Sequence, residues 1–249
     1  MGLIALLYGV IAYVVFLAAF LYAIVFVGNI AELPGGLLVP KNIDSGVPGA
    51  PVPSAIVDAI LLSIFALQHS LMARPAFKRV WTHIVPSSVE RSTYVLLSSL
   101  ALLLIYWQWQ PLPDAVWTVT NPLAMTVLAF LFWVGWGIVL VSTFLLDHFE
   151  LFGLRQVWAR MRGDAVPAAR FRTPLFYNVV RHPIYLGFVI AFWSAAVMSQ
   201  GHLLFALATT GYIFLGIFLE ERDLVACFGE TYVVYRKRVW MIVPLPPSR

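Results

Sequence analysis

The 249-residue chain is 61% hydrophobic and only 11% charged, and its mean hydropathy is +0.87, whereas about a quarter of the residues of soluble domains are charged. This composition excludes an ordinary water-soluble fold. The single cysteine, Cys227, excludes an internal disulfide framework and a thiolate metal cluster built by one chain. The net charge of +4 is modest, and membrane topology explains it better than a nucleic-acid partner does.

Apolar runs predict a helical bundle that crosses the membrane about six times. A transmembrane helix needs about 20 mainly apolar residues, and four runs meet this requirement clearly: residues 3–27, 55–73, 92–109 and 124–146. Two shorter runs, 184–199 and 202–219, predict a tight C-terminal helical hairpin. The first run lacks the charged region and cleavage site of a secretory signal, so we interpret it as a retained span. The expected fold is an all-α polytopic membrane bundle, with residues 1–249 forming one domain.

The positive charges support six spans. Cytoplasmic loops carry an excess of Lys and Arg, and with six spans fifteen of the 16 such residues fall on one side. The exception is Lys41, in the loop of residues 28–54. We therefore expect both termini to be cytoplasmic. The loop of residues 28–54 is rich in Pro and Gly and is assigned no function, while Trp107, Trp109 and Trp117 are expected to be interfacial anchors.

Arg181, His182 and Pro183 form a first polar cluster at the cytoplasmic face. Pro183 suits the first position of a helix, where its missing N–H would have no partner. The free N–H groups of that helix start, beside Arg181 and His182, would suit an anion. Gly187 would let another backbone or a flat ligand approach closely. The alternative is an ordinary basic flank next to a proline helix start.

Glu220 and Glu221 form a second cluster, a hairpin's length from the first. Acidic residues are unfavourable at the C-terminal end of a helix, so either the helix continues or the acids have a cationic partner. That partner could be an arginine of the chain, but a ligand ammonium or a ribose diol suits the position equally. An acidic site beside an anion site fits a zwitterion.

Two further groups lie at the same face. Tyr232, Tyr235 and Arg236 share one helical face, although an interfacial amphipathic helix would show much of this pattern. Polar residues also end the second and fourth spans, namely Gln68, His69, Asp147, His148 and Glu150. A histidine at a membrane edge is usually a hydrogen-bonded structural residue, but the unperturbed pKa of histidine lies near neutrality and suits proton transfer.

The order and spacing of these motifs resemble a known superfamily. Residues 181–187, 220–224, 228–229 and 239–244, with Tyr232 and Tyr235, are similar to the isoprenylcysteine carboxyl methyltransferase superfamily of membrane enzymes, over about residues 173–246. Residues 68–75, 90–94 and 147–156 look like the bacterial methanethiol S-methyltransferases, which are similar to the nitrite and nitric-oxide reductase regulator membrane family.

This resemblance implies S-adenosylmethionine as the methyl donor and methanethiol as the acceptor, giving S-adenosylhomocysteine and dimethyl sulfide. Residues 172–249 would bind the cofactor and residues 1–171 would shape the substrate pocket, in a bacterial inner membrane. The resemblance implies no metal, nucleic acid or obligate protein partner. Besides the small thiol substrate, the chain is expected to contact membrane lipid. The implied cofactor-binding residues are Arg181, His182, Pro183, Tyr185, Leu186, Gly187, Glu220, Glu221, Tyr232, Tyr235 and Arg236.

Methyl transfer to sulfur needs a group that accepts the thiol proton, because the thiolate is the nucleophile. The candidate catalytic residues are Gln68, His69, Asp147, His148 and Glu150, and we favour Asp147 with His148. Other readings stay open: methylation of a lipidic or prenylated carboxylate, reduction by a nicotinamide nucleotide as in the related sterol reductases, or a non-enzymatic accessory role in nitrogen-oxide respiration.

Overall fold

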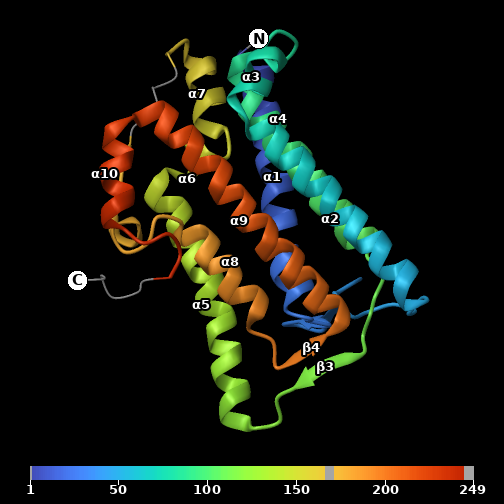
Figure 1. Cartoon of the computed structure of the whole chain (residues 1–249). Coiled ribbons are helices and arrows are strands. Elements are labelled where there is room, and N and C mark those ends of the chain that lie inside the picture. The colour runs from blue at the N-terminus through green and yellow to red at the C-terminus, as the bar shows by residue number, and fades with distance from the viewer. Residues whose placement is uncertain (1, 166–170, 244–249) are drawn as a thin grey trace.

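The computed structural model describes residues 2–165 and 171–243, and it is a bundle of long helices (Figure 1). Five helices are long and apolar enough to cross a membrane: α1 (Gly2–Val27), α2 (Pro51–Ala73), α4 (Ser87–Gln108), α5 (Pro122–Leu146) and α9 (Gln200–Phe228). A sixth apolar helix, α8 (Pro183–Trp193), is shorter. The prediction of an all-α polytopic membrane bundle is confirmed.

These six helices pack as a ring. Going around it, α1 contacts α4, α4 contacts α2, α2 contacts α9, α9 contacts α8, and α8 contacts α5. The ring closes where Phe20 of α1 meets Trp136 of α5 edge to face. All six helices contribute to one buried core, which includes Phe26, Leu62, Tyr106, Trp136, Phe192 and Phe205. Large apolar side chains such as Leu3, Ile4 and Phe130 remain exposed on the outside, as expected of a surface that faces lipid.

Proline and capping side chains set where the helices begin. Pro51, Pro122 and Pro183 each occupy the first helical position, where a missing N–H costs no hydrogen bond. Asn121 caps α5 by accepting a hydrogen bond from the N–H of Ala124, and Ser199 caps α9 by accepting one from His202.

The expected span of residues 184–199 differs from the structure in its second half. The 11 residues of α8 are about 17 Å long at about 1.5 Å per residue, which is short of a hydrocarbon core about 30 Å thick. The chain then leaves the helix and forms strand β4 (Val197–Ser199), which pairs antiparallel with β3 (Ala115–Thr118). The backbone groups of this extended segment find partners in β3 and where Ala196 accepts a hydrogen bond from Val119.

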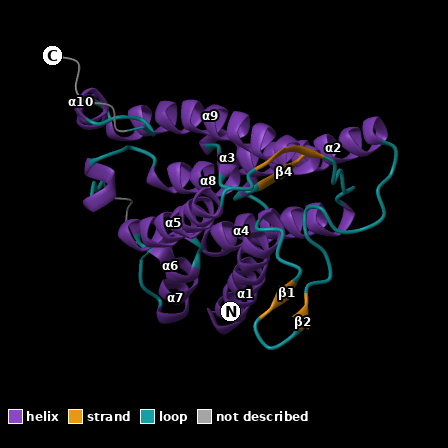
Figure 2. Ribbon diagram, turned by 90° about the horizontal axis from the view of Figure 1, so that it is seen from below, coloured by secondary structure: helices purple, strands orange, loops and turns teal. Residues whose placement is uncertain are grey.

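The two ends of the bundle are built differently (Figures 1 and 2). We call one end the basic end; it carries the short helices α3 (Pro75–Trp81), α6 (His148–Leu151), α7 (Leu154–Arg162) and α10 (Glu230–Arg238), and the 3-10 turn η1 (Leu175–Asn178). The opposite, cap end comprises residues 28–50, with the short strands β1 (Glu32–Leu33) and β2 (Leu37–Leu38), together with residues 109–121 and 194–199. Within the described residues, Lys41 is the one Lys or Arg at the cap end.

Candidate active site at the basic end

The start of α8 brings together an arginine, a histidine and a glutamate. Arg181 Nε lies 2.7 Å from Glu221 Oε1, and His182 Nε2 lies 3.2 Å from the same oxygen. All three side chains are largely buried, at 10%, 4% and 12% exposure. The backbone N–H groups of Arg181 and His182 donate to Trp240 and Met241, which fixes this turn against the chain after α10.

For the acidic pair, Glu220 and Glu221, both alternatives left open by the sequence hold: the helix continues, and there is a cationic partner. Helix α9 continues past Glu220 and Glu221 to Phe228, so these residues are not at its end. Glu221 also has its cationic partner in Arg181, while Glu220 Oε2 accepts a hydrogen bond from the Tyr185 hydroxyl at 2.9 Å. Arg236 of α10 is half exposed and reaches to 3.7 Å from Glu221 Oε2. The structure therefore brings the cationic and acidic motifs into one cluster.

Three tyrosines lie on the elements next to this cluster, Tyr177 on η1 and Tyr232 and Tyr235 on α10. Tyr232 is 2% exposed, and the Tyr235 hydroxyl donates to the carbonyl of Tyr177 in η1. Burial and the charge of Glu220 raise the pKa of Tyr177. Burial and the charge of Glu221 likewise raise the pKa of Tyr232, and that of Tyr235 rises mainly through burial to about 12. All three hydroxyls therefore keep their protons at neutral pH.

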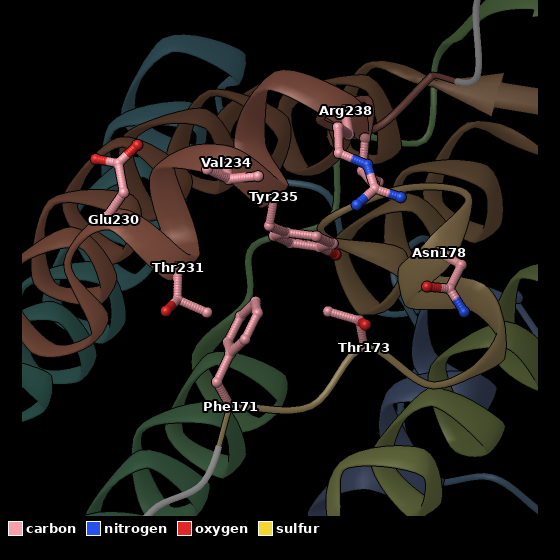
Figure 3. Close-up of a pocket in the computed structure, with 9 residues that line it drawn as sticks. Phe171, Thr173, Asn178, Glu230, Thr231, Val234, Tyr235 and Arg238 are labelled. Atoms are coloured by element: carbon pink, nitrogen blue, oxygen red, sulfur yellow. The ribbon is translucent and has the colours of Figure 1, made fainter.

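An open cleft of about 780 Å³ lies between α10 and the segment of residues 171–178 (Figure 3). Tyr235 lines it with Phe171, whose ring centroid is 5.3 Å from that of Tyr235. Its other lining residues are mostly polar or small: Thr173, Asn178, Glu230, Thr231, Val234, Arg238 and Val239. Through this cleft, solvent reaches Tyr235.

Three predicted cofactor residues pack against protein. A Cβ added to Gly187 would lie 2.6 Å from the carbonyl oxygen of Gly135, so the absence of a side chain lets α8 approach α5. The expectation that Gly187 admits another backbone or a flat ligand is therefore met by a backbone. Pro183 is fully buried, and Leu186 packs with Ile213 and other apolar residues.

His69 belongs to a second polar group that adjoins the first. Its Nε2 lies 2.8 Å from the Tyr94 hydroxyl, and its Nδ1 lies 3.2 Å from Ser98 Oγ. The next residue on α2, Ser70, donates to the Tyr212 hydroxyl of α9 at 3.1 Å. The preceding residue, Gln68, directs its amide nitrogen to the sulfur of Met72.

One face of α9 connects this second group to the acidic pair. Tyr212, Gly216 and Glu220 follow one another at intervals of four residues and so share a face. The Tyr185 hydroxyl, which binds Glu220, also lies 3.8 Å from the position of a Cβ at Gly216. This face of α9 therefore connects the His69 group, which lies on the earlier spans, to the cluster of Arg181 and Glu221.

Asp147, His148 and Glu150 form a separate group. Asp147 lies between α5 and α6 with φ of 89°, accepts a hydrogen bond from the N–H of Glu150 and pairs with Arg155. Glu150 contacts the same arginine at 3.1 Å. His148 bonds the hydroxyls of Tyr13 and Thr143, each at 2.8 Å. Among the described residues, no hydrogen bond or ion pair joins Asp147 to His148 or this group to Glu221.

Sequence reasoning missed Tyr94, Tyr177 and Tyr212. Tyr94 and Tyr212 lie inside apolar spans, where a tyrosine on an inward face resembles any other core aromatic residue. Tyr177 lies outside every predicted helix. A signal was nevertheless present for Tyr94, which stands in the stretch of residues 90–94 that carries the resemblance.

Comparison with known proteins identifies the family. The chain is 52% identical to Methanethiol S-methyltransferase 1 of Bradyrhizobium diazoefficiens over 97% of its own length and 82% of that protein. It is 51% identical to Methanethiol S-methyltransferase of Mycobacterium tuberculosis, with 97% and 96% covered, and 30% identical to Nurim of Xenopus laevis, with 67% and 61% covered. No family model matches the chain, and no solved structure matches it. At half identity over nearly its whole length, the chain belongs to the methanethiol S-methyltransferase family.

Proposed function

We propose that this chain transfers the methyl group of S-adenosylmethionine to methanethiol, giving dimethyl sulfide and S-adenosylhomocysteine. Relatives about half identical to it carry the name methanethiol S-methyltransferase. The structural observation that carries the proposal is the juxtaposition of the α8 start and the acidic pair of α9, because a zwitterionic amino acid needs both an anion site and a cation site.

The residues present fit this methyl donor. No side chain caps the start of α8, so its free N–H groups and His182 suit the carboxylate. Glu220, which is 42% exposed, suits the ammonium or a hydroxyl. The rings of Tyr185 and Tyr232 offer faces that attract a positive sulfonium or stack with adenine. Bound there, the cofactor supplies an activated methyl group.

The residues of the chain must then bind the acceptor and take its proton. Methanethiol is small and apolar, so it can enter from the lipid and needs only a small space between helices. We place the acceptor beside the His69 group, since α9 joins that group to Tyr185 and Glu220. His69 would accept the thiol proton as the thiolate sulfur attacks the methyl carbon. His148 with Asp147 is the rival assignment, and its proton would have to travel past Tyr13 or Thr143.

The topology of the proposal follows from the distribution of charge. The basic end would face the cytoplasm of a bacterial cell, where the positive excess belongs, and both chain termini would lie there. Residues 172–249 supply most of the proposed donor site, and residues 1–171 supply the His69 group.

The alternative functions are not favoured. A carboxyl methyltransferase or an accessory protein would not account for relatives at 48–52% identity that carry one shared enzyme name. A nicotinamide nucleotide is also a poor match, because its phosphates would meet the carboxylates of Glu220 and Glu221.

The test is turnover by the purified full chain in detergent. With methyl-labelled S-adenosylmethionine and methanethiol under reducing conditions, we expect labelled volatile dimethyl sulfide and a stoichiometric amount of S-adenosylhomocysteine. A folded protein that binds the donor but labels only lipid would instead indicate a lipidic acceptor. Absence of both binding and product would count against a methyltransferase.

Comparing His69→Ala with His148→Ala decides between the two proton acceptors. We expect turnover to fall at least tenfold in His69→Ala, with the affinity for S-adenosylhomocysteine retained. A loss confined to His148→Ala, in a protein of unchanged thermal stability, would restore the Asp147 and His148 assignment.

A further inference from the structure

One ion pair ties the two described parts of the chain together at the basic end. Arg74 Nη1, at the end of α2, lies 2.8 Å from Asp223 Oδ2 on α9. Within residues 2–165 and 171–243, every other ion pair joins residues of the same part. The pair therefore links the part that carries the proposed acceptor group to the part that carries most of the proposed donor site.

The sequence around Arg74 explains why its side chain lies between the two helices. Pro75 follows it, and the residue before a proline disfavours the helical conformation. Arg74 accordingly has φ of −72° and ψ of 137° and ends α2. Its Nε donates to the Ser70 carbonyl at 3.2 Å, in the last turn of α2. One guanidinium group therefore bonds both the end of α2 and Asp223 of α9.

A hydroxyl contact next to His69 supports the same alignment of α2 and α9. Ser70 Oγ donates to the Tyr212 hydroxyl at 3.1 Å, and the ring centroids of His69 and Tyr212 are 6.4 Å apart. Tyr212 and Asp223 are about three helical turns apart, so both contacts lie on one face of α9. Within the described residues, the other hydrogen bonds between the two parts all involve residues of the cap end.

We propose that Arg74 and Asp223 are positioning residues, which set the distance between the thiol at His69 and the methyl donor beside Glu220. Neither side chain touches the reacting atoms. Attack requires the sulfur and the methyl carbon to lie about 3–3.5 Å apart, and a displacement of about 1 Å can cost about a hundredfold in rate. This inference rests on the proposed function, because it assigns what aligns the two substrates of that reaction.

The test measures turnover of methanethiol by the full chain in detergent, together with the affinity for S-adenosylhomocysteine. Arg74→Gln and Asp223→Asn should each lower kcat at least about tenfold, with the affinity for S-adenosylhomocysteine unchanged. The double variant should lose no more than either single variant, because both changes remove the same contact. Arg74→Lys keeps the cation and should recover part of the rate. The melting temperature should change little, since partly exposed ion pairs contribute little to stability.

Lys78→Gln is the matched control. Lys78 Nζ lies 3.8 Å from Glu90 Oε1, but both residues belong to the first part of the chain, so kcat should not change. Amide hydrogen exchange adds a readout that needs no turnover. Arg74→Gln should speed exchange in residues 70–73 and 217–228, whereas Lys78→Gln should leave both segments unchanged.

Three results would overturn the inference: an equal loss of kcat in Lys78→Gln, additive losses in the double variant, or unchanged exchange in Arg74→Gln. Failure of the proposed function has a different signature. A wild-type chain that binds S-adenosylhomocysteine but does not methylate methanethiol would contradict that function, while the exchange comparison would still decide whether the pair aligns α2 with α9.

Discussion

The cap end and the basic end use their buried polar groups in opposite ways. At the cap end, the Trp109 indole donates to the Ile43 carbonyl at 3.0 Å, and the Tyr22 hydroxyl donates to the Lys41 carbonyl at 2.6 Å. Asp44 accepts hydrogen bonds from Ser199 and from Asn29. At the basic end, by contrast, the buried hydroxyls of Tyr177 and Tyr232 lack such partners within the described chain.

We interpret this difference as one between polar groups that build the fold and polar groups that we propose to be part of a binding site. The loop of residues 28–50 has no predicted function, yet it folds over the bundle and buries Ile43 completely. Asp58 is an exception near the cap end. It is fully buried on α2, and among the described residues only its Oδ1 accepts a hydrogen bond, from the N–H of Gln110. The cap end is thus a closure, and the chemistry is expected at the basic end.

The largest effect that would sharpen this contrast is expected from Glu221→Ala. Removing one partner of a buried ion pair costs about 3–5 kcal/mol, and here Arg181 and His182 both lose their carboxylate. We expect turnover to fall at least a hundredfold and donor affinity to fall with it. Glu32→Ala, an exposed acid of the cap end, is the control. Equal activity of the two variants would remove the acidic pair from the site.

A second prediction concerns α8, which starts in the site at the basic end and leads toward the cap end. In Gly135→Ala, the new Cβ would lie 2.6 Å from the Gly187 carbonyl and 2.7 Å from the Ala191 nitrogen. We expect a loss of about 1–3 kcal/mol, seen as a lower melting temperature. Gly137→Ala, two residues away on the same helix, meets nothing within 4 Å and should be neutral. Similar melting temperatures for both would contradict the close approach of α5 and α8.

At the cap end, Asp44→Ala should affect stability and leave chemistry alone. The variant loses the hydrogen bonds to Ser199 and Asn29, so we expect a destabilisation of about 1–2 kcal/mol. The KM for the methyl donor should not change, because both bonds lie at the end away from Glu221. A KM raised severalfold in a protein with unchanged melting temperature would break the division between the two ends.

The smallest expected effect is the pH dependence caused by His148. Burial lowers the pKa of His148, so the unfolded chain takes up a proton at a higher pH than the folded chain does. The contribution of the neutral ring to stability is therefore present above the unfolded pKa of about 6.5 and is lost as pH falls below it. His148→Gln should make the melting temperature less sensitive to pH between about 7 and 5.5 than the same change at the exposed His83 does. An unchanged slope would mean that the ring is not held neutral.

Much of the fold could be predicted because periodic apolar runs and proline helix starts are local signals. Pro183 begins α8 as predicted, and the expected closeness of Arg181 to the acidic pair is seen at Glu221. The early end of α8 was not predictable, because the apolar residues after Trp193 suit a helix or a strand and the pairing with β3 decides. Trp109, expected at the interface, is fully buried because the Ile43 carbonyl satisfies its indole.

The residues proposed for the site could be named from the sequence only where they stand in recognisable motifs. Tyr177 was not among the candidates because its link to α10 is a tertiary contact, in which its carbonyl accepts a hydrogen bond from Tyr235. Leu186 and Gly187 belong to a motif that carries the resemblance, yet in the structure they serve helix packing. The catalytic candidates His69 and His148 stay predictions, since each has hydroxyl partners and only turnover distinguishes them.

The most direct test of the division between the two ends is amide hydrogen exchange of the full chain with and without S-adenosylhomocysteine. We predict slower exchange in η1, in the first turn of α8, in residues 217–228 of α9 and in α10, with no change in residues 28–50. Protection of residues 28–50, with none in η1 or α10, would contradict the account.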